Sequence, residues 1–323
     1  MRSEPLPSRQ MEVQITKRAS DLNMFARPAI PFLNARTALK AFLLGLGFSS
    51  DDEVLLPAYV GWSKNEGSGV FDPIQEVGVK FRFYRLMRDL AIDLDDLRVR
   101  ITAGRPRLLL VIHYFGYPDP GLAEAVAYAR ASGMLVLEDE AHALYSDWVS
   151  GICGRLGDAA IMSLHKMLPF KSGGLLVLNS SLGVGTMDVL KHSPLRKPLE
   201  QSPLDYDLVG ISEVRRCNAV RLLELLQPLR GRAHPLHRLL PDGVVPQTLP
   251  VVITGKSRDE LYFRLNESGY GVVSLYHTLI KPIQKSEFPD SYWLAQRILN
   301  LPVHQDVSSG ALEALVTQLD RLL

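Results

Sequence analysis

The sequence contains few cysteines, with only Cys153 and Cys217 among its 323 residues. Two cysteines so far apart give neither a disulfide framework nor the spacing of a zinc site, so a small cross-linked secreted domain is excluded. The N-terminal residues MRSEPLPSRQ are polar and contain proline, without the apolar segment of a secretory signal. We therefore expect a reduced protein in the cytoplasm.

The sequence also lacks an excess of one charge and a long apolar run. Its 36 basic and 35 acidic residues leave a net charge of +1 and form no long blocks, so a nucleic-acid partner is not expected. The longest apolar runs, such as residues 108–112, have the length of a strand, whereas roughly 20 residues are needed to cross a bilayer. Small-molecule partners, and no membrane, are therefore expected.

Before about residue 195, short apolar runs alternate with helical stretches. A helix is expected from Ala35 to Leu46 with Asn34 as its N-cap, and a crossover helix from Gly121 to Ser132. This alternation predicts an α/β fold with a mostly parallel mixed sheet between helices. The expected strands are residues 54–56, 81–84, 108–113, 135–137, 159–163 and 175–178.

The composition changes near residue 195, where prolines become frequent. Helices are expected at residues 212–226, 257–268 and 310–323, and a strand at 250–253. We therefore predict two domains. Residues 1–195 form a large domain with an N-terminal arm, and residues 196–323 form a smaller C-terminal α/β domain.

Polar residues follow the apolar run 134–137. Glu138, Asp139, Glu140 and His142 lie where this run ends, and ligands of α/β proteins bind at the carboxyl ends of strands. The carboxylates could also cap the next segment, or could bind a metal ion. Because no second ligand cluster has a suitable spacing, no metal is expected.

A second candidate is Lys166, which follows the predicted strand 159–163. A lysine at a strand end can form a Schiff base if its surroundings lower its pKa. Enzymes that use pyridoxal 5'-phosphate (PLP) need such a lysine and a carboxylate partner for the ring nitrogen, and Asp139 supplies the carboxylate. Lys171, which follows Pro169, competes with Lys166 for this role.

A third candidate is the expected helix start at Asn34, Ala35 and Arg36. Free N–H groups and the positive end of the helix dipole can hold a phosphate there, and Arg36 adds charge. An ordinary capped helix would have the same sequence.

Taken in order, seven segments resemble the DegT/DnrJ/EryC1/StrS family of PLP-dependent sugar aminotransferases, which have the PLP-dependent transferase fold of type I, that of aspartate aminotransferase. The resemblance covers most of the chain. The segments are ARTAL from residue 35, DDEVLLPAYV from 51, DLAIDLDDL from 89, VIHYFGYP from 111, LEDEAHAL from 137, GRLGDAAIMSLHK from 154 and LNLPVHQDV from 299.

The resemblance implies a role for each candidate. Lys166 would carry PLP as a Schiff base, Asp139 would pair with the ring nitrogen, and His142 would contact the phenolic oxygen. The phosphate would be held by Ser163, Ala35 and Arg36.

The sequence departs from the family pattern at several places, among them the spacing of the lysine and position 61. Lys166 follows Ser163 by three positions, whereas five is usual in the family. An aromatic residue that is common in the family is replaced by Gly61. The remaining candidates for stacking on the PLP ring are Tyr59, Trp62 and His113.

The resemblance also implies the reaction and the assembly. We expect a homodimer that transfers an amino group from an amino acid such as L-glutamate to a keto sugar, nucleotide-linked as in the family. The alternatives are a PLP-dependent sugar dehydratase-like enzyme, whose relatives carry histidine in place of the lysine, and a non-catalytic regulatory or binding protein that retains the fold. A metal hydrolase built on Asp139, Glu140 and His142 is a third.

Overall fold

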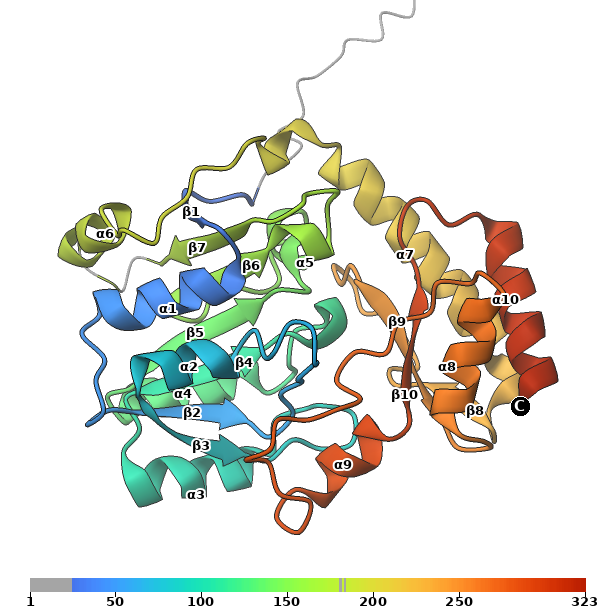
Figure 1. Ribbon diagram of the computed structural model, residues 1–323, viewed down its shortest axis with the longest axis horizontal. Helices are drawn as coiled ribbons and strands as arrows, with labels where there is room; N and C mark the ends of the chain where they lie inside the picture. Colours follow the sequence, from blue (N-terminus) through green and yellow to red (C-terminus); the bar gives the residue numbers. More distant parts are fainter. Residues whose placement is uncertain (1–24, 180–181, 183) are drawn as a thin grey trace, which may run out of the picture.

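The computed structural model describes residues 25–179, 182 and 184–323. Most of the N-terminal arm expected from the sequence, residues 1–24, lies outside this range. Figure 1 shows two groups of elements side by side, one built on a large sheet and the other on a small one.

The larger sheet has seven strands in the order β1-β7-β6-β5-β4-β2-β3, and within it only β7 runs opposite to the others. The six strands expected from the sequence are all present, so the predicted mostly parallel mixed sheet is confirmed. The strands are β1 (Ala29–Phe32), β2 (Glu53–Pro57), β3 (Lys80–Tyr84), β4 (Leu108–Ile112), β5 (Leu135–Glu140), β6 (Ala159–Ser163) and β7 (Gly174–Leu178).

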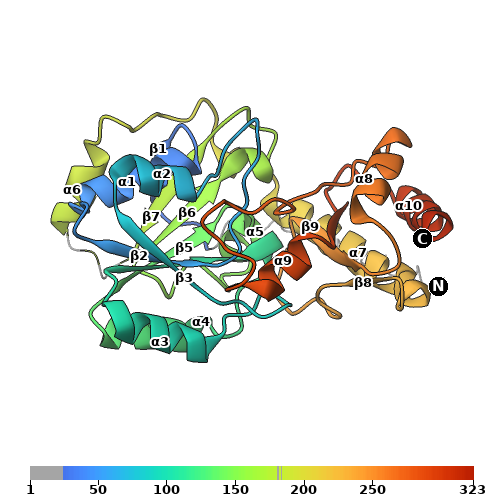
Figure 2. The same ribbon diagram turned by 60° about the horizontal axis from the view of Figure 1, so that its bottom comes forward.

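Helices cover both faces of this sheet (Figures 1 and 2). On one face, α1 (Ala35–Gly45) packs against α2 (Phe71–Val77), α6 (Val184–Lys191) and strand β7. On the other, α3 (Leu94–Gly104) packs against α4 (Leu122–Ala131). This layering buries the apolar faces of both the helices and the strands.

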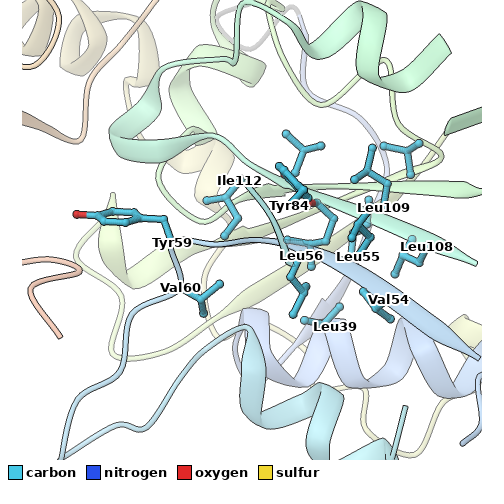
Figure 3. Close-up of a cluster of buried hydrophobic side chains, with 14 of the residues drawn as sticks. Leu39, Val54, Leu55, Leu56, Tyr59, Val60, Tyr84, Leu108, Leu109 and Ile112 are labelled. Atoms are coloured by element: carbon cyan, nitrogen blue, oxygen red, sulfur yellow. The ribbon is translucent and has the colours of Figure 1, made fainter. Parts of the chain in front are cut away.

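The core of the large sheet lies between α1 and the central strands. Leu39 of α1 lies beneath Val54 and Leu56 of β2, and all three side chains are fully buried. Figure 3 shows that Tyr59, which follows β2, points away from this cluster and beyond the end of the strand. The residues after β2 are thus available at the edge where the parallel strands end.

The smaller sheet consists of β8 (Ala233–Pro235), β9 (Thr248–Ile253) and β10 (Ile298–Pro302), all antiparallel. It packs against α7 (Leu208–Leu225), α8 (Arg258–Glu267) and α10 (Ser309–Leu322). The helix predicted from residue 212 begins at residue 208, because the side chain of Asp207 accepts a hydrogen bond from the N–H of Gly210 at 2.9 Å.

The two groups share buried surface. Leu294 and Ala295 of α9 (Pro289–Ala295) belong to the core of the large sheet, although they lie far along the C-terminal segment. The division of the chain into two domains between residues 195 and 196 therefore stays a prediction. In the described part of the chain, no helix has the length and apolar character needed to cross a membrane.

Candidate active site

The candidate site lies where β4, β5 and β6 end. Lys166 closes a short 3₁₀ turn, Leu164–Lys166, that follows β6. The carbonyl of Met167, the next residue, accepts hydrogen bonds from the hydroxyl of Tyr145 at 2.9 Å and from the Arg215 guanidinium at 3.4 Å. Two buried side chains from other elements thus hold the backbone that carries Lys166.

The amine of Lys166 contacts the imidazole of His142, with Nζ at 3.2 Å from Nε2. The Nδ1 atom of His142 accepts a hydrogen bond from the Phe115 N–H at 3.3 Å. An accepting Nδ1 places the proton of a neutral imidazole on Nε2, which then donates to the lone pair of a neutral lysine. The arrangement therefore favours the unprotonated amine.

Burial sets the protonation of both partners. Burial lowers the pKa of the Lys166 ammonium; the negative charges of Asp139 and Glu66 oppose this shift. Although the residue as a whole is exposed, the pKa of Lys166 is lowered by the protein atoms that surround its nitrogen. Burial, followed by the Lys166 charge, lowers the pKa of His142 well below its ordinary value. A neutral lysine amine is the nucleophilic form.

Asp139 is the penultimate residue of β5, and its charge acts on Lys166. One of its carboxylate oxygens accepts a hydrogen bond from the Ala141 N–H at 2.9 Å, and the residue is 4% exposed. Burial raises the pKa of Asp139, and the positive charge of Lys166 counters part of the increase. A cationic ring nitrogen placed beside this carboxylate would favour its ionised form.

The start of α1 lies beside Ser163. In the sheet, Gly174 of β7 pairs with Ser163 on one side and with Phe32 of β1 on the other. Asn34 caps the helix, since its Oδ1 accepts from the Thr37 N–H at 2.9 Å. Ser163 and the start of the helix therefore both lie next to Gly174, and the free N–H groups of a helix start suit an anion.

The approach of α1 requires glycine at position 174. A Cβ added there would lie 2.1 Å from the carbonyl carbon of Asn34 and 2.4 Å from the nitrogen of Ala35. We expect Gly174→Ala to lower the free energy of unfolding by about 1–3 kcal/mol, because backbone atoms must move to relieve the overlap. Urea unfolding followed by circular dichroism measures this change.

The matched control is Gly69→Ala. A Cβ at position 69 meets no atom within 4 Å, so this variant should unfold within about 0.5 kcal/mol of the wild type. Equal unfolding midpoints for Gly174→Ala and the wild type would show that the helix start tolerates a side chain there.

Arg36 lies near the same helix start. Its guanidinium donates to the carbonyl oxygen of Glu66, and its Nη1 lies 3.8 Å from a carboxylate oxygen of Asp72. Among the described residues, its buried Nε has no hydrogen-bond partner. Arg36 also adds to the lowering of the pKa of Lys166, after burial. Its positive charge therefore acts at the candidate site.

The structure separates the three candidates for ring stacking. Tyr59 is fully buried, and its ring stacks on Tyr276 with centroids 5.3 Å apart. Trp62 is 45% exposed. The ring of His113 is fully buried, and its Nε2 lies 2.8 Å from a carboxylate oxygen of Glu138. Of the three, only Tyr59 is in contact with an aromatic group that also touches His142.

Glu138 and Glu140 alternate with Asp139 along β5, so their side chains point to the other face of the sheet. Glu138 accepts hydrogen bonds from the N–H groups of Gly154 at 2.7 Å and Gly157 at 2.6 Å. Burial alone would raise its pKa, but His113 and these N–H groups hold the pKa below its usual value. Glu138 thus anchors the loop after residue 150 to the sheet.

One alternative from the sequence was a metal hydrolase whose metal site consists of Asp139, Glu140 and His142. In the part of the chain that the structure describes, one group could hold a metal ion, and it consists of His113, Glu140 and Cys153, with ligand atoms within 4.8 Å of one another. Asp139 and His142 are not in it. Burial raises the pKa of Glu140 well above its usual value, which favours a neutral carboxyl group there.

Lys171 occupies a different place from Lys166. It lines a cavity of about 210 Å³, together with Phe170 and the segment from Lys197 to Gln201. Lys166 is not among the residues that line this cavity. Lys166 instead contacts His142 and interacts through charge with Asp139, the residues that the sequence grouped with it.

Sequence patterns did not indicate several residues of the site. Tyr145 and Arg215 bind the backbone carbonyl after Lys166, and the negative charge of Glu66 opposes the lowering of the Lys166 pKa. Phe115 donates to His142, and Tyr276 packs against the same imidazole. They come from separate loops and helices with no shared motif, so only the three-dimensional structure brings them together.

Residues 22–213 match the DegT/DnrJ/EryC1/StrS aminotransferase family. The chain is 26% identical over 333 residues to dTDP-4-dehydro-2,3,6-trideoxy-D-glucose 4-aminotransferase of Saccharopolyspora spinosa, with 90% of this chain and 84% of the relative covered.

Solved structures have the same fold. DesV of S. venezuelae, in complex with a ketimine intermediate, superposes with a TM-score of 0.75 at 19% identity over 93% of this chain and 86% of that one. The putative sugar aminotransferase Spr1654 of Streptococcus pneumoniae, in its PLP form, gives 0.74 at 16% identity over 94% and 90%. The fold predicted from the sequence is therefore confirmed.

Proposed function

Since the chain belongs to the DegT/DnrJ/EryC1/StrS aminotransferase family, we propose that it transfers an amino group from L-glutamate or a similar donor to a nucleotide-linked keto sugar. It is a PLP-dependent aminotransferase, as the sequence predicted. The observation that carries the residue assignment is the contact between the Lys166 amine and His142, beside the buried carboxyl group of Asp139.

The residues present fit PLP. The amine of Lys166 has a lowered pKa, as a residue that bonds to an aldehyde requires. Asp139 offers a carboxylate at the end of β5, and the start of α1 offers N–H groups beside Ser163. We assign Lys166 as the lysine that holds PLP, Asp139 as the partner of the ring nitrogen, and Ser163 with Ala35 and Arg36 as the phosphate site.

When bound, PLP supplies an electron-poor ring that takes up the electrons released as a carbon–hydrogen bond of the substrate breaks. The negative charge of Asp139 would keep a proton on the ring nitrogen of bound PLP. Lys166 removes a proton from one carbon of the substrate and returns it to another, acting as general base and then as general acid. His142 holds the Lys166 amine in place between these steps.

The substrate assignment rests on the relatives. The relative from Saccharopolyspora spinosa acts, by its description, on a dTDP-linked 4-dehydro sugar, and DesI has been solved with its TDP-sugar product. We propose a substrate of the same class, a keto sugar on a nucleoside diphosphate. We also propose a homodimer, and a cytoplasmic location that the two free cysteines, Cys153 and Cys217, support.

The test separates the two halves of the reaction. Protein loaded with PLP is mixed with L-glutamate, and we expect one 2-oxoglutarate per active site together with a change in the visible absorbance of the cofactor. A nucleotide-linked keto sugar is then added, and mass spectrometry should detect the amino sugar. Purified protein that stays colourless and binds no added PLP would support the non-catalytic alternative, and sugar that loses water without gaining nitrogen would support the dehydratase-like one.

A further inference from the structure

Tyr276 enters the candidate site from the C-terminal segment, in the stretch between α8 and α9. Its ring stacks on Tyr59 at 5.3 Å with an interplanar angle of 28°. It meets the rings of Tyr114, Phe115 and His142 edge to face, with centroids 5.3, 5.8 and 5.8 Å away. One side chain from a distant part of the sequence thus joins the aromatic residues that follow β2 and β4 to the imidazole beside Lys166.

The backbone holds Tyr276 in an unusual conformation. Its φ angle is +58°, in the left-handed region that costs a non-glycine residue free energy. Hydrogen bonds on its C-terminal side tie the segment to the loop after β2: the Trp62 N–H donates to the carbonyl of Thr278 at 2.9 Å, and the Ile280 N–H donates to that of Val60 at 3.0 Å. These contacts keep the tyrosine directed at the site.

Gly61 makes room for this ring. A Cβ added at position 61 would lie 3.0 Å from Cδ1 and 3.6 Å from Cε1 of Tyr276. The backbone of Gly61 is not in the left-handed region, so space and not conformation explains the glycine. A side chain at position 61 would therefore crowd the ring of Tyr276, so the two side chains compete for adjoining space.

Tyr276 is also electrostatically close to the cofactor-binding carboxylate. Burial, and then the negative charge of Asp139, raise the pKa of its phenol well above the usual value. Unlike Tyr59 and Tyr114, which are buried, the Tyr276 residue is partly exposed. An aromatic ring that lies near both Asp139 and His142 is placed to contact a planar ligand held at Lys166.

We propose that Tyr276 is a positioning residue that lies against the PLP ring and substitutes for a side chain at position 61. The inference rests on the proposed function, because it requires PLP at Lys166. Tyr276 comes from the segment that pairs with residues 60–62, so the ring contact couples the C-terminal segment to the cofactor.

The first test compares Tyr276→Ala with Tyr276→Phe. Removing the ring should weaken PLP binding by about 3- to 10-fold, the usual worth of one aromatic contact, whereas phenylalanine keeps the ring and should bind as the wild type does. Equilibrium titration with PLP gives the affinity, and circular dichroism in the visible band of the cofactor reports how firmly the ring is held. The band should shrink in Tyr276→Ala alone.

A second-site change separates this role from general packing. Adding Gly61→Phe to Tyr276→Ala returns an aromatic ring to the space beside position 61. We expect this double variant to recover both the PLP affinity and the visible circular dichroism. Phe263→Ala, which removes an exposed aromatic side chain of α8, is the control and should change neither. Thermal unfolding of each apoprotein identifies any variant that is misfolded.

Three outcomes would overturn the inference. They are unchanged binding in Tyr276→Ala, tighter binding, which would mean that the ring occupies the place of the cofactor, and failure of Gly61→Phe to rescue a folded Tyr276→Ala protein. Failure of the proposed function is distinguishable, because the wild-type protein would then not bind PLP at all.

Discussion

Replacing Lys166 with alanine is expected to abolish covalent attachment of PLP and to lower amino-group transfer by about 10³-fold. The amine that bonds to the cofactor and moves the proton is lost, and positioned proton transfer alone contributes about 10²–10⁴-fold. Borohydride reduction followed by peptide mass spectrometry should find PLP on the peptide that contains Lys166 in the wild type and on no peptide in the variant.

Lys171→Ala is the matched control. Lys171 is five positions away, follows Pro169 and lines a cavity with the segment 197–201. We expect the variant to keep the covalent attachment and to react within about twofold of the wild-type rate, as surface substitutions usually do. Attachment that is lost in Lys171→Ala and kept in Lys166→Ala would reverse the assignment.

The sequence could indicate the centre of the site because of where parallel strands end. Asp139 follows one predicted strand and Lys166 follows the next, and adjacent parallel strands bring such residues to one edge of the sheet. The same edge of the sheet brings the Lys166 amine next to the imidazole of His142. Which residues surround this centre depends on loops whose paths leave no periodic pattern in the sequence.

Tyr276 is a residue whose place in the site the sequence could not predict. It lies 110 positions from Lys166 along the chain, and its φ of +58° is one that propensities do not favour for tyrosine. The sequence instead offered Tyr59, Trp62 and His113 as stacking candidates. His113 could not be distinguished from them, because its bond to Glu138 depends on the register of β4 and β5.

The fold was predictable where strands are uniformly apolar. All residues of β4 and β6 are buried, and both strands were indicated by their apolar runs. The strand β1 was missed because Pro31 lies within it, and proline is tolerated there since β1 is at the edge of the sheet. The strand β10 was missed because Asn300 interrupts its apolar run; the buried amide oxygen of Asn300 accepts from the Thr248 hydroxyl at 3.1 Å.

Replacing Asp139 with asparagine is the second change for which we expect a large effect. The amide keeps the size of the carboxyl group but loses the charge that keeps a proton on the ring nitrogen. A hydrogen bond to a charged group contributes about 1.5–3 kcal/mol, so PLP should bind about 10- to 100-fold more weakly. Transfer from L-glutamate should fall by about 10²-fold or more, because an unprotonated ring takes up electrons less well.

The neighbouring residue supplies the control. Glu140 belongs to the same strand but points to the opposite face, and burial raises its pKa well above the usual value. Glu140→Gln keeps the size of a side chain that points away from the face of Asp139, so PLP affinity should stay within about twofold of the wild-type value.

The comparison of the two variants decides what Asp139 does. If Asp139→Asn weakens PLP binding and Glu140→Gln does not, the loss reflects the charge beside the ring nitrogen, because both substitutions replace a carboxyl group by an amide of the same size at the end of β5. If both variants lose affinity equally, the end of the strand is sensitive to any change, and the carboxylate of Asp139 is not the partner of the ring nitrogen. Titrations of the two folded proteins with PLP, under identical buffer conditions, measure the difference directly.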